Sequence, residues 1–123
     1  MSPRVLVVDD EGNIRAETVE LVENKGYRVE EAGDGLEGIQ MFERDPQDLV
    51  ITDIRMPGVD GYELIRRIRE GYPDVPIIVV TGHFSATDLK EAKDAGATII
   101  LKKPINPLEL SQQLDLLLEP TED

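Results

Sequence analysis

The 123-residue sequence contains no cysteine and no tryptophan, and its other aromatic residues are three tyrosines and two phenylalanines. Without cysteine, the chain can form neither a disulfide framework nor a thiolate metal site, which favours an intracellular location. No apolar run approaches the roughly 18 residues of a membrane span, and the first residues lack the apolar segment of a secretory signal. We therefore expect a cytoplasmic protein that does not enter a membrane.

Positive charge is also scarce, with 13 Lys and Arg residues against 26 Asp and Glu residues and a net charge of -13. This excess repels nucleic acid phosphates and anionic lipids, whereas it favours divalent cations and basic protein surfaces. Direct nucleic acid binding is therefore not expected. The length predicts one domain over residues 1–123, with an ordered core from about 4 to 118 and an acidic tail at 119–123.

Four short apolar runs each end at a polar residue that can bind metal or phosphate. They are residues 5–8 before Asp9 and Asp10, 49–52 before Asp53, 77–80 before Thr81, and 99–101 before Lys102 and Lys103. Continuous runs of Val, Ile and Leu are typical of strands buried on both faces of a parallel sheet, and such sheets bind ligands beyond their carboxyl ends. The pattern predicts that carboxylates, a hydroxyl and an ammonium meet at one sheet edge.

Amphipathic segments alternate with these runs. The predicted helices cover residues 13–25, 35–44, 61–71, 85–95 with Ser85 as cap, and a last helix from Pro107 with Asn106 as cap. Residues 27–32 alternate in polarity, which is typical of an edge strand. Five strands in strict alternation with five helices predict an α/β fold, a single doubly wound (βα)5 domain whose parallel sheet carries helices on both faces.

Three acidic residues, Asp9, Asp10 and Asp53, end two of the predicted strands. Carboxylates held together repel one another and raise each other's pKa unless a cation balances them. Mg²⁺ is a hard cation that takes oxygen ligands, whereas zinc prefers nitrogen or sulfur. The pattern therefore predicts a magnesium site, which Mn²⁺ can also occupy.

Each of these features also has a purely structural explanation. Residues 9–11 are equally well suited to begin the following helix, since negative charge is favourable near a helix N-terminus. Taken alone, Asp53 before a Pro-Gly loop is more typical of a turn. One of the two lysines must face solvent, because neighbours on a strand point in opposite directions. Only the coincidence of these residues at one sheet edge favours a functional site, with Lys103 inward because it precedes Pro104.

Several motifs in this order resemble a known family. They are Val7-Val8-Asp9-Asp10-Glu11, Asp53 followed by Met56-Pro57-Gly58 and Gly61, then Thr81, and finally Lys103-Pro104. Together they resemble the receiver domain of two-component response regulators over essentially the whole chain. The resemblance implies a flavodoxin-like fold with the strand order 2-1-3-4-5.

The resemblance also implies how the metal is held. Asp10 and Asp53 would contact the ion directly and Asp9 would act through water. The backbone carbonyl of Arg55 would be a further ligand, so that Arg55 contributes by its position rather than its side chain.

For the chemistry, the resemblance implies that Asp53 accepts a phosphoryl group with Thr81 and Lys103 beside it. Negative charge spreads over the phosphoryl oxygens during transfer, so an ammonium and a hydroxyl suit these roles. The resemblance also implies a cis bond between Lys103 and Pro104, although only about 5% of X-Pro bonds are cis in general. His83 is expected to be a solvated loop residue without a catalytic role.

The implied function is a signalling switch that modifies only itself and is not an enzyme. Its phosphoryl donor would be a sensor histidine kinase or a histidine phosphotransfer protein. A protein target would bind the face formed by helix 85–95, strand 99–101 and the last helix, and the oligomeric state is left open. Two alternatives share the site: a phosphorelay shuttle, and the receiver fragment of a larger regulator with an effector domain. A flavin carrier or an aspartate phosphatase is disfavoured, because no Ser/Thr/Gly-rich loop follows the first strand and Asp9 and Asp10 are adjacent.

Two positions depart from the family pattern or vary within it. Ile100 stands where many receivers carry the Tyr or Phe that moves together with the threonine, here Thr81. An aliphatic side chain has neither a flat ring nor a hydroxyl, so the usual aromatic rotamer switch is not expected here. The signal is expected to pass instead through the loop at 82–85 and the alanine-rich helix. Arg55 follows the acceptor by two residues. We hypothesise that its side chain reaches the phosphoryl oxygens and alters hydrolysis.

Overall fold

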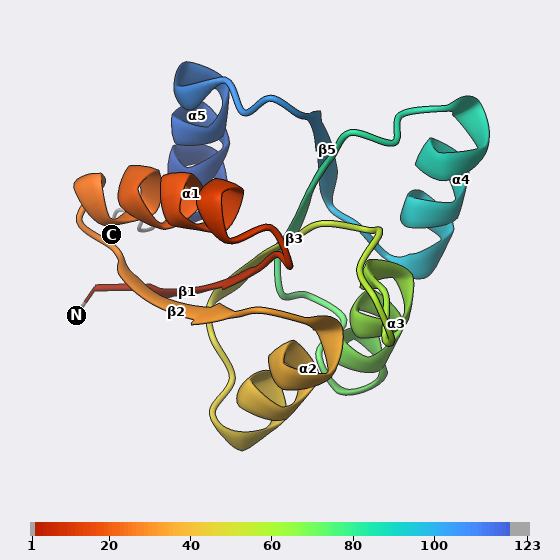
Figure 1. Cartoon of the computed structure of the whole chain (residues 1–123). Helices are drawn as coiled ribbons and strands as arrows, with labels where there is room; N and C mark the ends of the chain where they lie inside the picture. Colours follow the sequence, from red (N-terminus) through yellow and green to blue (C-terminus); the bar gives the residue numbers. More distant parts are fainter. Residues whose placement is uncertain (1, 119–123) are drawn as a thin grey trace.

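The computed structural model describes residues 2–118, and the predicted acidic tail at 119–123 lies outside this part of the chain. Strands and helices alternate along it (Figure 1). The strands are β1 Arg4–Val8, β2 Arg28–Ala32, β3 Leu49–Thr52, β4 Ile77–Thr81 and β5 Ile99–Lys102. The helices are α1 Gly12–Asn24, α2 Gly35–Arg44, α3 Gly61–Gly71, α4 Ala86–Ala95 and α5 Pro107–Leu118.

The predicted alternation is confirmed, and several predicted boundaries are wrong by one residue. β4 and β5 each include a polar residue that was expected to follow the strand, because Thr81 and Lys102 still pair in the ladder. α1 ends at Asn24 because Lys25 is already the cap residue, and Gly26 follows with a φ of 94°. A left-handed glycine at this place is what the sequence predicts.

The strands form one parallel sheet in the predicted order β2-β1-β3-β4-β5. β2 lies at an edge, as its alternating sequence predicts, with Glu30 half-buried and Glu31 exposed. In a parallel sheet all carboxyl ends point the same way. The residues that end β1, β3, β4 and β5 are therefore brought to one edge of the molecule.

Helices α1 and α5 cover one face of the sheet, and α2, α3 and α4 cover the other (Figure 1). Because successive strand residues face opposite sides, β1 contributes Val5 and Val7 to one core and Leu6 and Val8 to the other. Burial of each such side chain contributes about 1.5–3 kcal/mol. Within residues 2–118, no helix is both long and apolar enough to span a bilayer.

Candidate functional site

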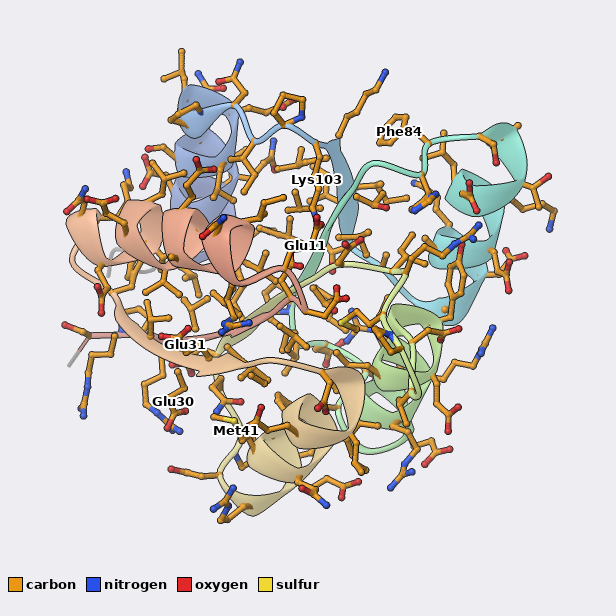
Figure 2. The ribbon with its side chains drawn as sticks, in the orientation of Figure 1. Glu11, Glu30, Glu31, Met41, Phe84 and Lys103 are labelled. Atoms are coloured by element: carbon orange, nitrogen blue, oxygen red, sulfur yellow. The ribbon has the colours of Figure 1, made fainter. Side chains whose placement is uncertain are left out.

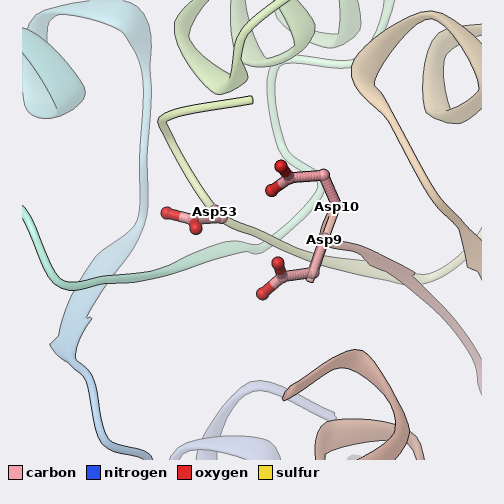
Figure 3. Close-up of side chains that lie close together, drawn as sticks. All are labelled: Asp9, Asp10 and Asp53. Carbon is pink, nitrogen blue, oxygen red and sulfur yellow. The ribbon is translucent and has the colours of Figure 1, made fainter. Parts of the chain in front are cut away.

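The acidic residues at the ends of β1 and β3 meet beyond the sheet edge (Figure 3). Asp9, Asp10 and Asp53 each offer a carboxylate oxygen, and these oxygens all lie within 4.8 Å of one another. Asp9 and Asp53 are buried, whereas Asp10 is exposed. Two strands far apart in sequence therefore place three carboxylates in one small volume.

Backbone hydrogen bonds fix the two buried carboxylates. Asp53 donates its backbone N–H to the carbonyl of Val8 at 3.1 Å, which continues the pairing of β1 and β3. One carboxylate oxygen of Asp53 accepts from the N–H of Ile54 at 2.6 Å. One oxygen of Asp9 accepts from the N–H of Glu11 at 2.9 Å. Each buried carboxylate keeps its other oxygen for a further partner.

Gly61 keeps the loop after Asp53 close to α3. Its N–H donates to the carbonyl of Ile54 at 2.7 Å. A Cβ at this position would lie only 2.1 Å from the carbonyl oxygen of Asp53, so glycine is needed for the close approach. The side chain of Asp60 caps α3 by accepting from the N–H of Glu63 at 3.0 Å. The start of α3 thus fixes the backbone that carries Asp53.

The Lys103 side chain enters the site from the end of β5. Its ammonium lies 2.8 Å from a carboxylate oxygen of Asp53, 2.9 Å from Glu11 and 3.1 Å from Asp9. Lys102 is exposed, so Lys103 is the inward lysine of the pair, as expected. The expectation of a cis bond between Lys103 and Pro104 is confirmed.

Burial and the neighbouring charges shift the pKa values of Asp9 and Lys103. Burial raises the pKa of Asp9, and the N–H of Glu11 and the Lys103 ammonium offset only part of this effect. Burial opposes the charge on Lys103, but hydrogen bonds and ion pairs with Asp53, Glu11 and Asp9 raise its pKa overall. One ammonium faces several carboxylates, so negative charge remains in excess.

This donor set suits a hard divalent cation. The cluster offers carboxylate oxygens and no sulfur or imidazole, and the ligand oxygens are close enough to share one ion. Mg²⁺ prefers such oxygen ligands and retains waters in its open positions. The residues present therefore fit the predicted magnesium site.

Thr81 ends β4 beside this cluster and is fully buried. Its hydroxyl oxygen accepts a hydrogen bond from the backbone N–H of His83 at 3.0 Å. The backbone N–H of Lys103 donates to the Thr81 carbonyl at 2.8 Å, so the two residues are held together. The side chain of His83 is exposed, as expected for a loop histidine.

The side chain of Arg55 is bound to α4. Its guanidinium lies 2.9 Å from the carboxylate of Asp88, which also accepts the hydroxyl of Ser85 at 2.8 Å. These bonds, that of Ser85 first and that of Arg55 next, lower the pKa of Asp88. The loop after Asp53 is thus connected to the first turn of α4.

Ile100 is half-buried and packs against the core beneath α2, α3 and α4.

Two partners in and around the site were not predicted from the sequence. The sequence placed Glu11 in the motif of residues 7–11 and at a helix start, but gave it no contact with Lys103. It is the N-cap of α1 without a side-chain capping bond, and its carboxylate binds Lys103 instead. The run of residues 9–11 does lead directly into α1, as the structural explanation predicts, although the Glu11 side chain makes no capping bond. Asp88 was not singled out at all. The third acid in the run of residues 9–11 was the one available signal for Glu11.

The fold and the clustered site define a class of protein, and comparison with known sequences agrees with it. Over residues 5–115 the sequence matches the response regulator receiver domain family, and the chain belongs to this family. It is thus a receiver domain of a two-component response regulator.

Curated relatives and solved structures support this assignment. The chain is 38% identical over 121 residues to the response regulator MprA of Mycobacterium ulcerans, which covers 98% of this chain and 52% of that protein. For MprA of Mycobacterium leprae the identity is 37% over 118 residues, which cover 96% of this chain and 52% of that protein. The chain thus spans about half the length of these relatives.

Two solved structures share the fold over nearly their whole length. A CheY-like receiver domain protein from Methanospirillum hungatei superposes with a TM-score of 0.92 at 32% identity, covering 97% of this chain and 95% of that one. The chemotaxis protein CheY4 of Vibrio cholerae gives a TM-score of 0.89 at 34% identity, and the match covers 95% of this chain and 99% of that one. The predicted flavodoxin-like architecture is confirmed.

Proposed function

We propose that the chain is a phosphorylation-dependent switch in which Asp53 accepts a phosphoryl group from a phosphohistidine of a sensor kinase or a phosphotransfer protein. A carboxylate oxygen of Asp53 forms the new P–O bond while the P–N bond breaks, and the imidazole leaves with the electron pair. The observation that carries this proposal is the Asp53 carboxylate itself, which lies beside Asp9 and Asp10 and 2.8 Å from the Lys103 ammonium.

The proposed cofactor is Mg²⁺, or Mn²⁺ in its place. Asp9, Asp10, Asp53 and the backbone carbonyl of Arg55 would hold it. When bound, the ion supplies positive charge that neutralises the phosphoryl oxygens. Asp9 and Asp53 are buried and would form the inner side of this site. Asp10 is exposed and would form its outer side.

Two residues stabilise the transferred group in this proposal. Lys103 donates to one phosphoryl oxygen, and the hydroxyl of Thr81 donates its proton to another. The hydroxyl oxygen already accepts from His83, which leaves its hydrogen for the phosphoryl group. Movement of Thr81 and its loop would then change the packing of Ile100 and α4. A protein target would read this change on the face formed by α4, β5 and α5.

The test is phosphorylation by a small donor. Wild type and Asp53→Asn are incubated with acetyl phosphate and Mg²⁺, and intact mass is measured. We expect wild type to gain one phosphoryl group and Asp53→Asn to gain none. Asp94→Asn, which removes an exposed acid from α4, is the matched control and should be modified like wild type. An unmodified wild type whose NMR spectrum is also unchanged by beryllofluoride contradicts the proposal.

The length of the curated relatives favours one form of this function, in which the receiver acts within a longer regulator and passes the signal to an effector domain. A phosphorelay shuttle uses the same site but passes the phosphoryl group to another histidine. Incubation of the phosphorylated protein with histidine phosphotransfer proteins separates the two, because only a shuttle transfers its label at a rate that competes with hydrolysis.

A further inference from the structure

Three carboxylates surround the Lys103 ammonium, two as hydrogen-bond acceptors and Asp9 as an ion pair. A lysine ammonium carries three donors, and Asp53, Glu11 and Asp9 offer oxygens at 2.8, 2.9 and 3.1 Å. Figure 2 labels Glu11 and Lys103 between α1 and β5, where the side chains meet. A phosphoryl oxygen on Asp53 therefore competes for the ammonium with the other carboxylates that surround it.

The carboxylates differ in how firmly they are held. The side chains of Asp9 and Asp53 are 7% and 6% exposed, and each accepts a backbone N–H through its second oxygen. The side chain of Glu11 is 55% exposed. Release into water therefore costs Glu11 far less than it costs the buried aspartates, which would lose their partner without solvation.

Within residues 2–118, the Glu11 carboxylate has no bonded partner other than Lys103 to oppose its release. It is the N-cap residue of α1, a position where acidic side chains commonly accept a backbone N–H from the first turn. Its side chain makes no such bond. Only the backbone carbonyl of Glu11 serves the helix, by accepting from the N–H of Arg15 at 2.8 Å. The helix start therefore stays intact when the carboxylate moves.

We infer that Glu11 is a positioning residue, which holds the Lys103 ammonium in the resting protein and is exchanged for a phosphoryl oxygen when Asp53 is modified. This inference rests on the proposed function and names a residue outside the proposed metal ligands. A phosphoryl oxygen then takes the place of the Glu11 carboxylate beside the Lys103 ammonium. Glu11 thus competes with the phosphoryl group for the same donor, so its charge sets how tightly that group is held.

The first experiment detects the resting contact without ligand or metal and then follows it when a phosphoryl mimic is added. The side-chain carboxylate carbon of Glu11 is observed by ¹³C NMR in wild type and in Lys103→Met, with the amide spectrum as the check on folding. We expect the Glu11 signal to move in the variant, and to move in the same direction when wild type takes up beryllofluoride with Mg²⁺. A Glu11 signal that stays in place in both cases overturns the inference.

The second experiment measures the competition. Beryllofluoride, a phosphoryl mimic, is titrated with Mg²⁺ into wild type, Glu11→Gln and the matched control Glu20→Gln, which neutralises an exposed acid on the same helix. We expect Glu11→Gln to bind about fivefold more tightly, because the charge-assisted bond it removes is about twice as strong as a neutral one. Glu20→Gln should bind like wild type.

The outcomes distinguish the possible failures. Equal gains in Glu11→Gln and Glu20→Gln mean that net charge alone acts, and no gain or weaker binding in Glu11→Gln means that Glu11 does not compete. Either result overturns the inference while wild-type binding still supports the proposed function. A wild type that binds no beryllofluoride overturns both, and the Glu11 signal in Lys103→Met then shows whether the resting contact exists.

Discussion

Arg4 at the amino ends of the strands and Lys103 at their carboxyl ends each bind more than one carboxylate. Arg4 lies 3.1 Å from Glu30 and 2.9 Å from Asp45, and these three side chains are 25%, 41% and 72% exposed. Around Lys103 the carboxylates of Asp9 and Asp53 are less than a tenth exposed. Two clusters of similar composition thus lie in very different surroundings.

The partners of each cation explain what each cluster does. The Arg4 guanidinium also donates to the backbone carbonyls of Asp45 at 3.0 Å and Pro46 at 3.3 Å, so it ties the turn before β3 to β1. Among the described residues, the Lys103 ammonium is bonded or ion-paired only to carboxylates, and negative charge remains in excess around it. An exposed cluster bound to backbone stabilises a turn, whereas a buried cluster with excess negative charge has a donor set that suits a divalent cation.

The largest expected effect comes from removing the buried cation. Lys103→Met keeps the apolar stem but leaves the carboxylates without their ammonium, so the free energy of unfolding should fall by about 3 kcal/mol without divalent cations. Mg²⁺ should restore much of this loss. Urea denaturation with and without Mg²⁺ measures it, with Lys102→Met as the exposed control. Equal losses in the two variants, or a loss that Mg²⁺ does not change, would contradict the comparison.

The free energy of unfolding should also change with pH in opposite directions for Asp9 in the Lys103 cluster and for Glu30 in the Arg4 cluster. Burial raises the pKa of Asp9, so the native state holds this proton more tightly, and without metal the free energy of unfolding should fall as pH rises from the ordinary Asp range through that pKa. The hydrogen bond from Gln47 and the charge of Arg4 lower the pKa of Glu30. The stabilisation that Glu30 contributes to the native state is therefore present above the ordinary Glu range, and it is lost as pH falls through the lowered pKa.

Magnesium binding provides the measurement for Asp9. A proton competes with the metal for this carboxylate, so affinity should fall by about tenfold per pH unit below the raised pKa of Asp9. Calorimetric titration of Mg²⁺ across pH detects the decline, which should begin at a higher pH than for an ordinary aspartate. A decline that begins only in the ordinary Asp range would show that Asp9 takes no part.

A smaller effect is expected at the amino end. Arg4→Met removes partly exposed ion pairs, so the free energy of unfolding should fall by about 1 kcal/mol, and Mg²⁺ affinity should be unchanged. Chemical denaturation and Mg²⁺ titration of the same samples test both statements, with the exposed Arg44→Met as control. A loss of Mg²⁺ affinity in Arg4→Met would mean that the two ends are coupled.

Arg55 is an intermediate case, since it follows Asp53 in the sequence while its side chain is 55% exposed and bound to Asp88. A guanidinium that reaches the phosphoryl group would shield it from water, so Arg55→Ala should hydrolyse its aspartyl phosphate faster, by no more than about fivefold for so exposed a side chain. Asp88→Asn, which releases Arg55 from α4, should slow hydrolysis. Loss of phosphate is followed after removal of the donor, and an unchanged rate in Arg55→Ala rejects the hypothesis.

The sequence predicted much of the site because the relevant signals are local. Asp9, Asp53 and Thr81 could be found from the apolar runs that precede them, since parallel strands carry their ends to one edge. The contact between Glu11 and Lys103 could not be found in this way, because it joins residues 92 positions apart. The contact of Arg55 with Asp88 spans 33 positions and depends on how α4 packs.

The sequence predicts the alternation of strands and helices along the chain and their approximate ends. It also predicts the edge of the sheet where the polar residues gather. The physical reason is that hydrophobic period, caps and turn residues act over a few neighbours. Only the tertiary structure decided which carboxylates share the single ammonium and which of them remains exposed to water. Burial and side-chain distance belong to the packed molecule, and they separate the aspartates held inside the site from the glutamate at its surface.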